Sequence, residues 1–123
     1  MSDELSRLPP NVQERLLRLQ QLQQTLQSIL AQKQQVEMEK TEVEQTIAEL
    51  QKTAEDTVLY KAIGSLLVKA QKPKVTEELV ERKELLDTRS TVLARQEERM
   101  RSQIKEAQTK LQEDLSPVSQ PSS

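Results

Sequence analysis

Cysteine, histidine, phenylalanine and tryptophan are absent from this sequence of 123 residues, and glycine and tyrosine each occur once. Without cysteine and histidine the chain has no zinc finger, no thiol nucleophile and no Ser-His-Asp triad. A single glycine also excludes the G-x-G-x-x-G and Walker loops that bind phosphates. The sequence therefore argues against an enzyme, and it predicts no catalytic residue, no cofactor and no metal site.

Charge and hydrophobicity exclude two further classes of partner. A formal net charge of −2 argues against a general nucleic-acid binder. No apolar run approaches the roughly 18–20 residues of a membrane span, and we expect no signal peptide. We expect a cytoplasmic protein whose partners include neither nucleic acid nor membrane.

What the chain does contain is the composition of long helices. Hydrophobic residues make up 34% and charged residues 31%, with aromatics at 1%. This hydrophobic share lies below the usual 45–50% or so of globular chains, so a conventional core is not expected. The apolar residues are mostly leucine, isoleucine and valine, set among glutamine, glutamate, lysine and arginine, which favour helix.

The prolines divide the chain into two uninterrupted stretches. They occur only at positions 9, 10, 73, 117 and 121. Proline is well tolerated at the first helical position and breaks a helix elsewhere. We therefore predict helices over residues 10–54 and 73–115, followed by a disordered Ser/Pro-rich tail over residues 116–123.

Each predicted helix carries an apolar ladder with a period of seven residues. The first ladder is Leu22, Ile29, Val36, Val43 and Leu50, and the second is Leu79, Leu86, Leu93, Met100 and Ala107. Companion ladders follow four residues further on: Leu19, Leu26, Lys33, Lys40, Ile47 and Ala54 in the first helix, and Lys83, Ser90, Glu97, Ile104 and Leu111 in the second. Such ladders are the a and d positions of a coiled coil.

The short connection between the helices determines how they pair. A linker of about eighteen residues cannot return the chain along a helix of roughly 65 Å, which excludes a parallel pair within one chain. Folding back antiparallel is favoured over pairing with another chain because the partner helix is tethered. Lys33 and Lys40 make the middle of this helix–helix contact, the seam, polar. Lys33 either pairs with Glu97 and sets the register, or extends along the seam into water.

The segment from Val58 to Ala70 changes to a β pattern with Gly64-Ser65 at its centre. Glycine at the first loop position is typical of a type II′ hairpin turn. That turn would place Ile63 opposite Leu66, Lys61 opposite Val68 and Leu59 opposite Ala70. We therefore predict a β-hairpin over residues 58–70.

Both faces of this hairpin are largely apolar, and an isolated two-stranded hairpin is marginal in water. We expect hairpins from several subunits to form a shared sheet or barrel. The alternative is an apolar loop that caps the coiled coil. The residues predicted to mediate this oligomerisation are Val58, Leu59, Tyr60, Ile63, Gly64, Leu66, Leu67 and Val68.

Where the first helix begins and the second ends, more apolar residues are present than a seam requires. Leu16, Leu17 and Leu115 fall outside the ladders, and Leu5 precedes the helix. Exposed apolar side chains at helix ends can bind apolar segments of other proteins. The alternative is that these are stray surface leucines, which are common. Composition alone leaves both interpretations open.

Taken together, these features resemble the β subunit of prefoldin, especially the archaeal type. The hairpin segment Tyr60-Lys61 through Gly64 to Val68-Lys69 is the most specific part. The opening Leu8-Pro9-Pro10-Asn11-Val12-Gln13, the run Gln32-Lys33-Gln34 and the stretch Arg95-Gln96-Glu97-Glu98-Arg99 are also similar. The resemblance covers residues 8 to 115, and the single hairpin fits the β type because the α type carries two.

The resemblance implies one prefoldin-like domain over residues 1–123 with a mainly α fold: a long antiparallel two-helix coiled coil whose hairpin joins an intersubunit β-barrel. It implies a heterohexamer of two α and four β subunits that acts as an ATP-independent chaperone and delivers unfolded proteins to a group II chaperonin. Carried onto this sequence, the client-binding surface comprises Leu5, Leu8, Val12, Leu16, Leu111 and Leu115. The alternative is a coiled-coil oligomerisation or scaffold protein that binds no client.

Overall fold

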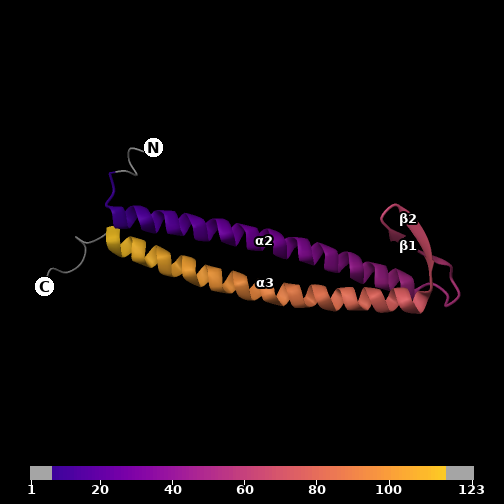
Figure 1. The fold of residues 1–123 in the computed structure, drawn as a ribbon. Coiled ribbons are helices and arrows are strands. Elements are labelled where there is room, and N and C mark those ends of the chain that lie inside the picture. The colour runs from indigo at the N-terminus through magenta and orange to yellow at the C-terminus, as the bar shows by residue number, and fades with distance from the viewer. Residues whose placement is uncertain (1–6, 116–123) are drawn as a thin grey trace. The chain divides into compact units, whose positions relative to one another are not determined.

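Two long helices and one β-hairpin make up the fold. The computed structural model describes residues 7–115. Helix α2 spans Pro10–Gln51 and helix α3 spans Lys72–Leu115, and the hairpin between them consists of β1 (Leu59–Ile63) and β2 (Leu66–Ala70) (Figure 1). The predicted mainly helical fold with a hairpin at the helix–helix connection is therefore confirmed.

The chain divides into two compact units. We call residues 7–32 and 93–115 the terminal unit, because it contains the start of α2 and the end of α3. We call Lys33–Val92 the hairpin unit. Within residues 7–115, neither helix carries an apolar stretch long enough for a membrane crossing.

Local capping contacts account for the helix boundaries. The carbonyl of Pro9 accepts hydrogen bonds from the amides of Val12 and Gln13, both at 3.0 Å, which begins α2. At the other end the Thr53 hydroxyl donates to the carbonyl of Leu50 at 2.6 Å, and the Thr53 amide donates to the same carbonyl at 3.1 Å. These bonds close the last turn, so α2 ends at Gln51 rather than near Ala54. Helix α3 begins at Lys72, one residue before the predicted start at residue 73.

In the terminal unit the seam between α2 and α3 is built from the predicted ladders. The buried side chains are Val12, Leu22 and Ile29 from α2 and Leu93 and Ile104 from α3. Further ladder members, half-buried, are Leu19, Leu26, Met100, Ala107 and Leu111. Arg15 near the start of α2 pairs with Asp114 near the end of α3, so the two segments run antiparallel.

In the hairpin unit the seam combines apolar ladder residues with polar pairs. Val36, Leu50 and Leu86 are buried. Lys40 Nζ lies 2.8 Å from Asp87 Oδ1, and Glu37, earlier in α2, contacts Ser90, later in α3, so the helices run antiparallel here too. The carboxylate of Asp87 is the main cause that raises the pKa of Lys40 above its usual 10.5.

Other polar contacts flank this pair. Ser90 Oγ donates to Glu37 Oε1 at 3.0 Å, and Arg82 Nη2 donates to Glu39 Oε2 at 2.9 Å. In the terminal unit, Glu97 accepts a hydrogen bond from Arg101 Nε at 2.8 Å, one turn along α3. Lys40, one of the two lysines predicted to make the middle of the seam polar, is thus paired with the carboxylate of Asp87. The pairing of Lys33 with Glu97 stays a prediction.

The hairpin has the predicted register. Ile63 pairs with Leu66, Lys61 with Val68 and Leu59 with Ala70. Gly64 has a φ of 58°, whereas Ser65 has no positive φ. A positive φ at the first loop position alone distinguishes a type II′ turn from type I′, which needs two. The strands themselves begin at Leu59, one position after the predicted start at Val58.

Candidate functional site

The hairpin exposes most of its large apolar side chains. Leu67 is 72% exposed, Leu66 65% and Tyr60 64%. Val58, Ile63 and Val68 are also exposed, and Leu59 is half-buried. We call this set, together with Gly64, the hairpin surface. Contiguous exposure of this kind is unusual for a monomer and marks a surface for interaction with other proteins.

Polar contacts hold this surface on the helices. Lys61 Nζ of β1 lies 2.6 Å from Glu78 Oε2 of α3. Lys72 Nζ, at the start of α3, donates to the carbonyl of Thr53 at 2.7 Å and lies 3.7 Å from Glu55 Oε1. Lys61 therefore tethers the hairpin to α3, and Lys72 fixes the segment that follows α2, while the apolar side chains of the hairpin remain available. Within the described chain, the sheet has two strands only, so both of its outer edges are unpaired.

The predicted client-binding residues differ in exposure. Leu115 is 53% exposed, and Leu8, Leu16 and Leu111 are half-buried. Val12 is 2% exposed and packs in the seam, because it continues the companion ladder one heptad before Leu19. Leu5 lies outside the described residues. We call Leu8, Leu16, Leu111 and Leu115 the helix-end surface.

Leu17, which the sequence pattern placed among the surplus apolar residues but not in the client-binding set, is 52% exposed. One feature of this region was missed by the sequence reasoning. Arg15 and Asp114 form an ion pair, and Asn11 Nδ2 also lies 3.4 Å from Asp114 Oδ2. A signal for the pair was present: Arg15 is one heptad before Leu22 and Asp114 is one heptad after Ala107, so opposite charges occupy matching ladder positions.

The chemistry of these surfaces is that of binding. In the described residues no group of three or more acidic, histidine or cysteine side chains is placed to hold a metal. Burial of exposed apolar side chains against another protein stabilises the complex by roughly 25 cal/mol for each Å² removed from water.

Comparison with known proteins identifies the family. The family model described as "Prefoldin subunit" matches residues 13–117. The prefoldin subunit beta of Archaeoglobus fulgidus is 47% identical over 113 residues, which is 92% of this chain and 97% of the relative. The prefoldin subunit beta of Methanothrix thermoacetophila is 45% identical and covers 88% of this chain and 90% of its own.

A solved structure agrees. The crystal structure of the prefoldin beta subunit from Thermococcus strain KS-1 superposes with a TM-score of 0.81 at 39% identity, over 90% of this chain and 97% of the other. The prefoldin beta2 subunit from the same strain shares the fold, with a TM-score of 0.66 at 21% identity over 74% of this chain and 97% of the other. The chain therefore belongs to the prefoldin family of chaperone subunits, and within it to the β type.

Proposed function

We propose that this chain is one of four β subunits that assemble with two α subunits into a cytoplasmic heterohexamer. The complex binds unfolded proteins at the helix-end surface, without ATP, and delivers them to a group II chaperonin. The observation that carries the proposal is that the exposed large apolar side chains of this β-type prefoldin chain are concentrated in the hairpin surface, while exposed or half-buried leucines gather where α2 begins and α3 ends. The proposal assigns assembly to the first and client binding to the second.

The exposed hairpin supports the assembly role. Its apolar faces and unpaired strand edges can be covered by hairpins of neighbouring subunits, which would convert marginal strands into a closed barrel. In such a barrel, the neighbouring hairpins would both stabilise the strands and bury the apolar side chains that are exposed in the single chain. The α subunit is the expected second component of that barrel.

The helix-end surface supports weak and unselective binding. Each half-buried or exposed leucine contributes a small apolar contact that does not depend on a defined client shape. Several such surfaces in one complex act together, so that weak contacts combine into useful avidity. Release requires no nucleotide when it follows from folding of the client or from competition by the chaperonin.

An aggregation assay tests the client-binding role. The complex containing the double variant Leu16→Ser/Leu115→Ser should lose most of its protection of an unfolding client, measured by light scattering without ATP. The matched control is Leu85→Ser, because Leu85 is 52% exposed on α3 and lies outside both surfaces. Sedimentation velocity should show the same assembly for all three proteins. Full protection by the double variant would contradict the proposal and favour a scaffold that binds no client.

A further inference from the structure

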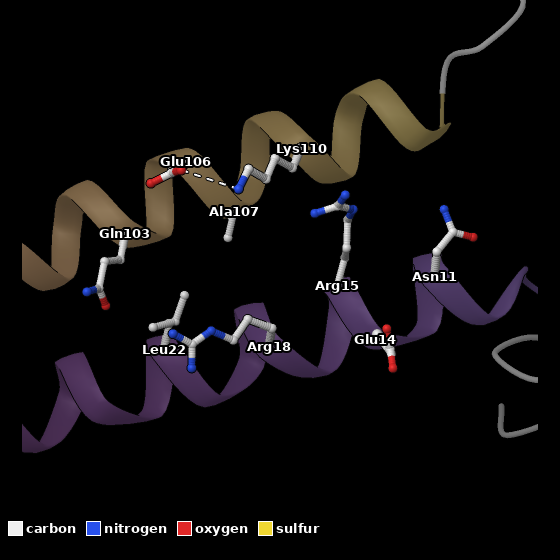
Figure 2. Close-up of a pocket in the computed structure, with 9 residues that line it drawn as sticks. All are labelled: Asn11, Glu14, Arg15, Arg18, Leu22, Gln103, Glu106, Ala107 and Lys110. Atoms are coloured by element: carbon white, nitrogen blue, oxygen red, sulfur yellow. Dashed lines mark ion pairs between the residues drawn. The ribbon is translucent and has the colours of Figure 1, made fainter.

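A groove of about 510 Å³ lies between α2 and α3 within the terminal unit (Figure 2). Its apolar lining comes from Leu22 of α2, which is almost fully buried, and from Ala107 of α3, which is half-buried. Arg18 of α2 and Gln103 of α3 also line it, and Figure 2 shows Gln103 projecting toward α2. The groove therefore places an apolar floor beside polar groups from both helices.

One of the residues that line the groove is a short side chain in the ladder of α3. The preceding members of that ladder are Leu79, Leu86, Leu93 and Met100, whereas Ala107 ends at its Cβ. A leucine or methionine at this position would extend into the space that the groove occupies. The seam is thus apolar but incompletely filled at this level, which is a departure from the close packing of protein interiors.

Some of the charged side chains around the groove form ion pairs and others do not. Arg15 is neutralised by Asp114, and Lys110 Nζ lies 3.3 Å from Glu106 Oε1. Arg18 has neither an ion pair nor a side-chain hydrogen bond within residues 7–115, and the same is true of Gln103. The guanidinium of Arg18 lies beside Leu22 (Figure 2). Glu14, also without an ion pair in the described chain, lies one turn nearer the start of α2.

We propose that this groove binds segments of unfolded polypeptide in which an aspartate or glutamate lies close to a leucine-like side chain. The carboxylate accepts hydrogen bonds from Arg18, which offers a planar pair of donors, and from the amide of Gln103. The apolar neighbour covers Leu22 and Ala107. This inference rests on the proposed function and adds a preference in sequence: the helix ends favour acidic apolar segments over neutral ones.

A pair of labelled peptides tests the preference. One is a 12-residue peptide of leucine, serine and glutamate, and the other has each glutamate replaced by glutamine. By fluorescence anisotropy, the full chain in its assembly should bind the glutamate peptide more tightly by roughly two- to fivefold, the factor an exposed ion pair supplies. Arg18→Gln should abolish this difference without weakening the glutamine peptide. Arg89→Gln, an exposed arginine of the hairpin unit, should retain it.

A second variant tests the groove itself. Ala107→Leu should place a larger side chain in the groove and lower the binding affinity for both peptides by roughly fourfold or more. The thermal unfolding midpoint should stay unchanged or rise. Equal affinity of the unaltered protein for the two peptides would overturn the inference, as would a preference that survives Arg18→Gln. If neither peptide binds while protection of an unfolding client is intact, the inference fails and the proposed function stands. If protection is absent as well, both fail.

Discussion

Leu85 and Leu86 are adjacent in α3 and have opposite environments. Leu86 is 0% exposed in the seam of the hairpin unit, whereas Leu85 is 52% exposed. Leu86→Ala should lower the free energy of unfolding by about 2–5 kcal/mol, because it removes a buried side chain and leaves a cavity. Leu85→Ala should change it by less than about 0.5 kcal/mol. Urea denaturation of both variants at one protein concentration measures the difference, and similar values would contradict the assigned seam.

The Lys40–Asp87 pair makes a pH-dependent contribution to stability. The neighbouring carboxylate raises the pKa of Lys40 above 10.5, so the folded state binds this proton more tightly than the unfolded state. The contribution is therefore fully present below pH 10.5 and is lost as the pH rises through the folded pKa.

Asp87→Asn should lower the melting temperature relative to the unaltered protein at pH 7, and the difference should shrink as the pH is raised above 10.5. Thermal melts followed by circular dichroism at several pH values measure it. Arg89→Gln, at an exposed residue of the same helix, serves as the control. A difference that is constant with pH would show that the ion pair does not contribute.

The heptad pattern predicts which side chains enter the seam because burial on a helix follows its period. It was less informative for polar partners. Arg15 and Asp114 occupy ladder positions, but a search for apolar residues passes over them. The choice of Asp87 as the partner of Lys40 depends on the exact register between two helices, which neither ladder alone contains. For Val12 the ladder implied burial and the family resemblance implied client contact, and the structure places it in the seam.

At the scale of elements, the turn chemistry determines the hairpin. A single glycine between two apolar runs was sufficient to predict both the turn type and the strand register. The end of α2 was predicted less well. Its last turn is closed by hydrogen bonds from Thr53 to the carbonyl of Leu50. A local side-chain bond of this kind can end a helix, but a threonine alone is a weak signal for it in the sequence. The ladder accordingly extended the predicted helix to Ala54, which is exposed and beyond α2.

Gly64→Ala tests the turn. A Cβ at this position would meet no atom within 4 Å, so the substitution acts only through the positive φ of 58°. The strain should be about 1–2 kcal/mol. Gly64→Asn should be milder because asparagine, unlike alanine, is common in the primed hairpin turns that require a positive φ. We expect the alanine variant to dissociate at higher protein concentration than the asparagine variant in sedimentation equilibrium. Identical dissociation of the two would indicate that the turn does not limit assembly.

At the scale of the whole molecule, the scarcity of large apolar residues has a consequence for where stability comes from. The seam takes up the ladder residues, and the hairpin surface remains exposed in the single chain. The sequence could predict that such a hairpin requires other strands, because two strands alone are marginal. It could not predict which chains supply them, since both faces of the hairpin are apolar and carry little information about the partner.

Leu67→Asp separates folding of the chain from assembly. Leu67 is 72% exposed, so aspartate at this position should leave the helical content and the seam unchanged. In a barrel formed by several hairpins the same carboxylate would be buried without a partner, at a cost of about 3 kcal/mol or more for each site. We therefore expect sedimentation velocity to show smaller species for this variant, with an unaltered far-ultraviolet circular dichroism spectrum.

Leu85→Asp, an equally drastic change at an exposed leucine outside the hairpin, should leave the assembly intact. An unchanged complex with Leu67→Asp would exclude the hairpin surface as the assembly site, and the exposed apolar residues of the hairpin would then require a different partner.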